Sequence, residues 1–249
     1  MTEPKGCDIN GGVTPVGIDI MADKGLVIKV IIRFISGLIL IGVFFFGTAG
    51  TFSWPEAWIF IGIQFSWSTV HALWLMKHNP ELLKDRLAIV KKSTKSWDRF
   101  IQIVSTPFFL AFLVIPGLDA VRFQWSKVPT AVKVICFVLT AAAFIWISRV
   151  MKENTYLSRV VEIQAERGHK VITTGPYKYV RHPMYVATLV LFFCLPPALG
   201  SLYGLIPAFF AALTVVIRTH LEDKTLHKEL EGYVEYAQKT KYRLIPGIW

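Results

Sequence analysis

The sequence predicts an all-α, polytopic integral membrane protein with about five to six transmembrane helices, including a C-terminal helical hairpin. Hydrophobic residues make up 53% of the 249 residues, aromatic residues make up 14%, and the mean hydropathy is +0.48. A soluble domain needs a largely polar surface, so this composition excludes one. The apolar residues also gather into long segments. Because backbone polar groups cannot stay unpaired in lipid, we expect these segments to be helices.

Six apolar segments are candidate membrane spans, since a hydrocarbon core about 30 Å thick needs roughly 20 helical residues to cross it. They are residues 27–48, 55–76, 101–116, 129–150, 183–200 and 202–217. The third, fifth and sixth are shorter than the others. The last two meet at Leu199-Gly200-Ser201, shortly after Pro196-Pro197. This predicts a tight helical hairpin over 183–217 that need not cross the membrane fully.

These spans divide the chain into three parts. Residues 1–24 are polar, which predicts a mobile N-terminal tail rather than a cleaved secretory signal. Residues 25–150 hold four predicted transmembrane helices. Residues 151–249 form the third part, which contains a charged connector, the hairpin and a cytoplasmic C-terminal helix. The amphipathic pattern of residues 226–239 predicts that this helix is a surface helix covering the ligand site.

Lysine and arginine are unevenly distributed among the loops. They crowd residues 77–99 and 149–181, whereas the intervening loop, 117–128, holds only Arg122 and Lys127. Short loops rich in these residues stay in the cytoplasm, so both termini and the connector are predicted to be cytoplasmic. Cationic loops facing anionic lipid headgroups also explain the net charge of +10. The sequence contains no motif that favours a nucleic-acid partner.

Ionisable and aromatic residues cluster where the fifth apolar segment begins. The cluster reads Gly175-Pro176-Tyr177-Lys178-Tyr179-Val180-Arg181-His182-Pro183-Met184-Tyr185. Gly175-Pro176 is a turn signal, and Pro183 sits where a helix can begin without losing a hydrogen bond. Arg181 and His182 therefore fall at a predicted helix start, where N–H groups and the positive end of the helix dipole favour an anionic ligand group.

A second polar cluster follows at the exit of the sixth segment. Arg218 and Glu222 stand four residues apart there, so on a helix they share one face. A planar cation and a carboxylate together suit a zwitterion. S-adenosylmethionine presents such an amino acid end, and aromatic walls for an adenine ring or a sulfonium are offered by Tyr177, Tyr185 and the Tyr233/Tyr236 pair.

Both clusters resemble the isoprenylcysteine carboxyl methyltransferase family, which is related to membrane phospholipid methyltransferases. The first cluster is similar to the family's G-x-Y-x-x-x-R-H-P-x-Y signature. Arg218-x-x-x-Glu222-Asp223 resembles its R-x-x-x-E-E element. Tyr233-x-x-Tyr236 and Arg243-x-x-Pro246 resemble its closing elements, so that the resemblance covers about residues 155 to 249.

The resemblance implies an S-adenosylmethionine-dependent membrane methyltransferase with its cofactor site on the cytoplasmic side. Its acceptor would be lipophilic: the carboxylate of a prenylcysteine-like substrate, a lipid amine or a thiol. Arg218 looks like the substrate-facing catalytic arginine, and Glu222 like the residue that holds the ammonium of the cofactor. The other cofactor-binding residues that the resemblance implies are Glu162, His169, Lys170, Val171, Ile172, Tyr177, Arg181, His182, Pro183, Met184 and Tyr185.

Three positions depart from the family's pattern. Asp223 replaces the second acid of E-E, and Glu162 stands where prenylcysteine enzymes have a glutamine. Ala187 replaces a glycine two residues after the motif tyrosine, which would tighten the pocket.

Other chemistries have less support in the sequence. The histidines include no H-E-x-x-H or similar spacing, so no metal site is expected. The three cysteines are expected to pack rather than to pair. No G-x-G-x-x-G follows a predicted strand, which argues against a soluble dinucleotide-binding domain. A membrane NADPH-dependent reductase of the sterol or steroid type and a non-catalytic membrane protein remain alternatives.

Overall fold

The computed structural model describes residues 24–87, 95–158 and 160–249. Within these residues all regular structure is helical, which confirms the predicted fold class. The predicted N-terminal tail, apart from Lys24, lies outside the described residues, and so does Cys7.

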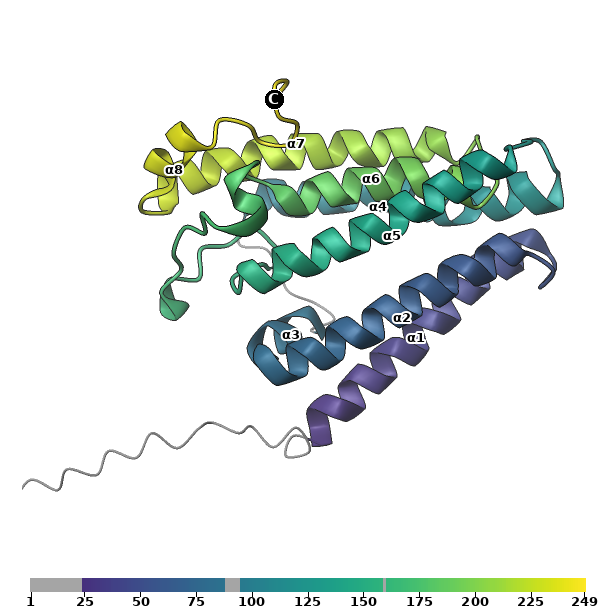
Figure 1. Ribbon diagram of the computed structural model, residues 1–249, viewed down its shortest axis with the longest axis horizontal. Coiled ribbons are helices and arrows are strands. Elements are labelled where there is room, and N and C mark those ends of the chain that lie inside the picture. The colour runs from purple at the N-terminus through teal and green to yellow at the C-terminus, as the bar shows by residue number, and fades with distance from the viewer. Residues whose placement is uncertain (1–23, 88–94, 159) are drawn as a thin grey trace, which may run out of the picture.

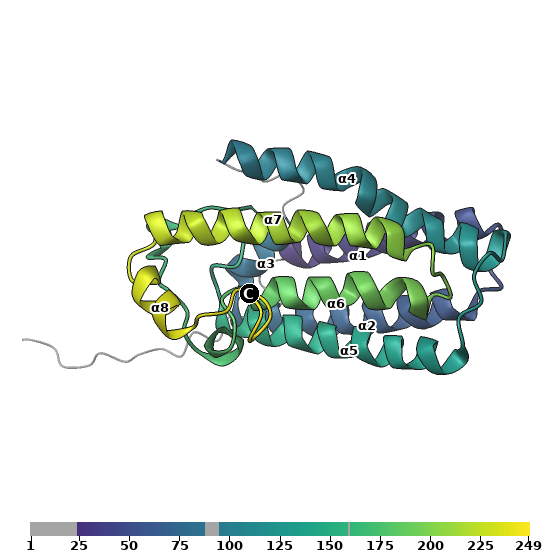
Figure 2. The same ribbon diagram turned by 90° about the horizontal axis from the view of Figure 1, so that it is seen from above.

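Among the described residues, five helices are long and apolar enough to cross a membrane. They are α1 (Lys24–Ala49), α2 (Pro55–His78), α4 (Ser96–Gly117, prolonged by a π-helix over Leu118–Arg122), α5 (Thr130–Glu153) and α7 (Leu205–Glu229). A shorter apolar helix, α6 (Pro183–Ala198), packs between α5 and α7 (Figures 1 and 2). The protein is therefore a multi-pass integral membrane protein.

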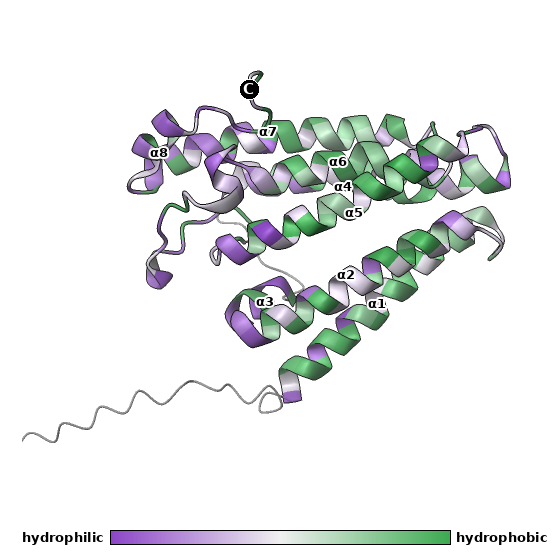
Figure 3. Ribbon diagram, in the orientation of Figure 1, coloured by the Kyte–Doolittle hydropathy of each residue, from purple (hydrophilic) through white to green (hydrophobic). Residues whose placement is uncertain are grey.

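The polar part of the chain gathers at one end of the bundle. Two short helices lie there, α3 (Pro80–Leu87) and α8 (Tyr233–Lys239), together with the connector between α5 and α6. Figure 3 shows that hydrophobic residues dominate the long helices, whereas hydrophilic residues collect at this end. A polar site can form there because the surrounding groups are not immersed in lipid.

Two predicted spans were too short. The segments 101–116 and 202–217 stop at the first charged residues, but α4 begins at Ser96 and α7 continues to Glu229. An apolar window marks only the part of a helix in contact with lipid, and these two helices extend past it. The predicted short fifth span is confirmed, since α6 has 16 residues.

The predicted surface helix over 226–239 is wrong in its extent. The first four residues of this segment still belong to α7, and the chain then turns before α8 begins at Tyr233. Gly232 makes the turn with a φ of 79°, a left-handed conformation that glycine adopts without a steric penalty. This turn folds α8 back toward the connector.

The start of α6 is built as the sequence predicts, and the C-terminal segment binds to it. Pro183 occupies the first turn of α6, after His182 as the N-cap residue. The backbone N–H of Arg181 donates to the carbonyl of Tyr242 (2.9 Å), and that of His182 donates to the carbonyl of Arg243 (3.0 Å). The end of the chain therefore lies against the R-H-P motif.

One large core cluster holds the long helices together, and a smaller second cluster joins the end of α5 to the Tyr177 segment and α8. The large cluster combines aromatic residues such as Phe45 and Phe144 with small residues such as Ala187 and Ala208, which allow α5, α6 and α7 to approach closely. Ala187 is 2% exposed within this core.

Candidate functional site

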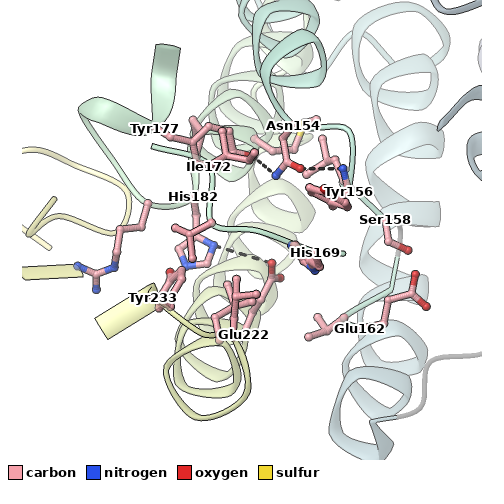
Figure 4. Close-up of a pocket in the computed structure, with 18 of the residues that line it drawn as sticks. Asn154, Tyr156, Ser158, Glu162, His169, Ile172, Tyr177, His182, Glu222 and Tyr233 are labelled. Atoms are coloured by element: carbon pink, nitrogen blue, oxygen red, sulfur yellow. Dashed lines mark hydrogen bonds and ion pairs between the residues drawn. The ribbon is translucent and has the colours of Figure 1, made fainter. Parts of the chain in front are cut away.

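A cavity of ≈ 300 Å³ opens at the polar end of the bundle, between the connector, the start of α6, the C-terminal half of α7 and α8 (Figure 4). Every residue that the sequence marked as catalytic or cofactor-binding lines this one cavity: Glu162, His169, Lys170, Val171, Ile172, Tyr177, Arg181, His182, Pro183, Met184, Tyr185, Arg218 and Glu222. Tyr233 and Tyr236, expected as aromatic walls, also line it. Ala187 does not, so its predicted effect on the pocket is wrong.

Sequence reasoning missed a further part of the wall. It consists of Arg86, Asn154, Tyr156, Leu157, Ser158, Val160, Val161, Leu226 and Leu230. Most of these residues come from the first half of the connector, which carries no recognisable motif. Only folding brings this segment opposite the R-H-P motif.

Asp223 is the central acceptor of the site. Its side chain is 1% exposed, and both oxygens bind Arg181, with Nε to Oδ1 at 2.8 Å and Nη2 to Oδ2 at 3.0 Å. Tyr233 donates its hydroxyl to Oδ1 (2.9 Å), and Arg243 donates Nε to Oδ2 (2.8 Å). His182 Nε2 lies 3.2 Å from Oδ1. Asp223, the aspartate that replaces the second glutamate of the E-E element, thus joins α6, α7, α8 and the C-terminal segment.

Arg181 faces this carboxylate and the chain end rather than open space. Besides Asp223, its Nη1 donates to the carbonyls of Thr240 (2.9 Å) and Lys241 (2.8 Å). Burial alone would lower the pKa of Arg181, but the hydrogen bonds and charge of Asp223 outweigh burial and raise it. The geometry makes Arg181 a structural cation at the cavity wall.

Glu222, next to Asp223, points into the cavity instead. Its Oε2 accepts a hydrogen bond from the hydroxyl of Tyr185 (2.5 Å), and its Oε1 lies 3.9 Å from His182 Nδ1 (Figure 4). The rings of His182 and Tyr185 stack with their centres 5.9 Å apart. Glu222 is 23% exposed at its side chain, so a ligand in the cavity can reach it.

Arg218 lies one turn before Glu222 on α7, as the i, i+4 spacing predicts. Its Nε forms an ion pair with Asp98 Oδ1 of α4 (2.9 Å), and its guanidinium carbon lies 5.9 Å from the centre of the Tyr185 ring. Asp98 was not identified from the sequence.

The connector supplies the opposite wall. Tyr156 stacks on His169 with ring centres 4.6 Å apart, and Asn154 donates to the hydroxyl of Tyr177 (2.8 Å; Figure 4). Burial, together with the nearby Arg167, lowers the pKa of His169 despite the opposing effect of Glu162. His169 is therefore a neutral aromatic surface at neutral pH.

The fold and the cavity define a multi-pass membrane protein with a cavity of mixed polar and apolar lining at one end of its bundle. Residues 128–231 match the family model for phospholipid methyltransferase. Most of the residues that line the cavity fall inside this matched segment. The first 127 residues lie outside the match.

One curated relative belongs to a different enzyme class. The chain is 33% identical over 93 residues to a delta(14)-sterol reductase of Schizosaccharomyces pombe. The aligned part covers 35% of this chain and 21% of the reductase, so the chain spans about a fifth of the length of that protein.

Proposed function

We propose that this protein is an S-adenosylmethionine-dependent methyltransferase that acts on a lipophilic acceptor. The observation that carries the proposal is Glu222: a carboxylate held by Tyr185 and His182 at the edge of a cavity with aromatic walls. A carboxylate at such a position suits the ammonium group of an amino acid. The matched family supports the same reaction type.

The lining fits the cofactor in its chemistry. Glu222 would hold the ammonium, and Tyr185 would keep the carboxylate oriented through its hydrogen bond. Tyr177, Tyr233 and neutral His169 offer aromatic surfaces for a purine and a sulfonium. S-adenosylmethionine, when bound, supplies a methyl group activated by the positive sulfur.

The protein's own contribution would be alignment and electrostatics rather than covalent chemistry. Arg218 would orient the acceptor near the Tyr185 side of the cavity. Apolar residues such as Met184, Leu226 and Leu230 would exclude water from the reacting groups.

The acceptor remains a choice between a prenylcysteine-like carboxylate, a lipid amine and a thiol. The resemblance to the isoprenylcysteine carboxyl methyltransferase family favours the carboxylate. The ion pair with Asp98 works against it, because this pair compensates much of the positive charge of Arg218. The phospholipid methyltransferase match supports a lipid acceptor.

A second candidate function is an NADPH-dependent membrane reductase, favoured by the identity to the sterol reductase. NADPH is larger than S-adenosylmethionine and carries several phosphates, which require cationic partners. Four arginine or lysine residues line the cavity, and two of them, Arg181 and Arg218, are paired with buried aspartates. This charge balance favours the methyltransferase.

The test is a calorimetric titration of the detergent-purified protein with S-adenosylhomocysteine and, separately, with NADPH. Each titration is repeated on Glu222→Gln and on a matched control, Glu235→Gln, an exposed acid of α8 outside the cavity. We expect saturable S-adenosylhomocysteine binding that Glu222→Gln weakens about tenfold, the scale of one lost hydrogen bond to a charged group. The control should bind like the wild type.

The other outcomes separate the alternatives. Binding of NADPH without S-adenosylhomocysteine would favour the reductase. A folded protein that binds neither compound would support a non-catalytic membrane role.

A further inference from the structure

Asp98 is a fully buried carboxylate at the edge of the candidate site. It lies in the first turn of α4, where the helix dipole favours a negative charge, and it is 0% exposed. Its Oδ1 pairs with Arg218 Nε (2.9 Å). Its Oδ2 accepts from Gln102 Nε2 (3.0 Å) and from the backbone N–H of Val161 (3.3 Å), a residue of the cavity wall.

This carboxylate comes from a part of the chain that the family match does not include, since the match begins at residue 128. Asp98 therefore connects the N-terminal helices to the wall of the cavity. A buried charge of this kind is costly unless it is paired, so its position calls for a specific partner. That partner is Arg218.

Arg218 has a second potential acidic partner on its own helix. Glu222 lies four residues further along α7, and arginine and glutamate at this spacing attract one another across a helix face. Glu222 also accepts a hydrogen bond from the hydroxyl of Tyr185 and lies beside His182. The pair with Asp98 holds the guanidinium on the α4 side.

We propose that Asp98 is a positioning residue, which holds Arg218 toward α4 and thereby leaves the Glu222 carboxylate to the cofactor. The inference rests on the proposed function, because it assigns the ammonium of the cofactor to Glu222. In the absence of the Asp98 charge, Arg218 would turn to Glu222 and compete with that ammonium. Asp98, which lies in the N-terminal half of the chain, would thus contribute to cofactor affinity without contacting the cofactor.

The test is a double-mutant cycle read out by calorimetric binding of S-adenosylhomocysteine. Asp98→Asn should weaken binding about tenfold, the scale of one hydrogen bond to a charged group. Adding Arg218→Gln should restore the affinity to within about threefold of the wild type, because the competing cation is gone. Asp98→Glu keeps the charge and should bind within about threefold of the wild type.

A merely structural role for Asp98 would not produce this restoration. The matched control is Asp119→Asn, a second fully buried aspartate that follows α4 at the far end of the bundle and accepts from Ser126 (2.7 Å) and Ser201 (2.6 Å). It should lower thermal stability while S-adenosylhomocysteine affinity stays unchanged.

Each outcome decides the inference. The positioning role alone is overturned if Asp98→Asn binds S-adenosylhomocysteine as tightly as the wild type. It is also overturned if the double mutant binds as weakly as Asp98→Asn. If Asp98→Asn does not fold, the Asp98→Glu and double variants decide, and weak binding by both overturns the role. A wild type that does not bind S-adenosylhomocysteine overturns the proposed function and this inference with it.

Discussion

Arg181 and Asp223 lie 42 residues apart in the chain and form a two-bonded, buried ion pair with side chains 6% and 1% exposed. The pair joins the R-H-P motif at the start of α6 to the acidic pair of α7. Arg243 and Tyr233 bind the same carboxylate, so the chain end and α8 are fastened at this point as well. The two sequence motifs are thus two halves of one structure.

Replacing this carboxylate should therefore unfold the site. We expect Asp223→Asn to lower the free energy of unfolding by about 3–5 kcal/mol, because it leaves buried arginine charge uncompensated. Denaturant unfolding of the detergent-purified protein measures the change. Glu222→Gln is the neighbouring control and should cost far less, since Glu222 is 23% exposed. Equal stability of the two variants would contradict the central role of Asp223.

The buried tyrosines should make the protein sensitive to alkaline pH. Tyr236 donates its hydroxyl to the carbonyl of Tyr177 (2.8 Å), and burial raises the pKa of Tyr236 to about 12. In the unfolded chain tyrosine titrates near pH 10, so the unfolded state loses this proton first. The native state then binds more protons, and the stability that is fully present below pH 10 is lost as pH rises toward about 12.

Tyr236→Phe removes one such group, so its unfolding temperature should fall less steeply with pH in this window. The check is a series of thermal unfolding curves across the window for both proteins. Tyr242→Phe, at an exposed position, should keep the slope of the wild type. An unchanged slope in Tyr236→Phe would show that this tyrosine does not contribute.

Arg218→Ala should reduce methyl transfer far more than cofactor binding. A side chain that stabilises developing charge contributes on the order of 100-fold to turnover, whereas S-adenosylhomocysteine affinity should change only a few fold. The measurement follows label from S-adenosylmethionine into vesicles of total membrane lipid, beside a calorimetric titration. The control is Lys228→Ala, at an exposed position of the same helix, which should retain both the rate of methyl transfer and the affinity for S-adenosylhomocysteine. An Arg218→Ala rate equal to that of the wild type would remove Arg218 from the proposed mechanism.

Much of the architecture could be predicted from the sequence because hydropathy is a local property. The apolar segments placed the membrane helices, and their boundaries differed most where charged turns extend a helix beyond its apolar part, as at Ser96 and between Arg218 and Glu229. Part of the cavity wall was also predictable. The residues that the sequence marked all line one cavity, whereas the first half of the connector, which carries no motif, was missed.

The sequence by itself thus determined the class of protein, the polar end of the bundle and the residues that meet there. Only the tertiary structure decided which of these residues face a ligand and which hold the site together. Neighbouring acids show the difference: Glu222 opens to the cavity, whereas Asp223 is enclosed by Arg181 from the start of α6, Arg243 from the C-terminal segment and the Tyr233 hydroxyl of α8. Asp98 belongs to no sequence motif. Its role depends on Arg218, which is distant in the chain and comes near Asp98 only through folding.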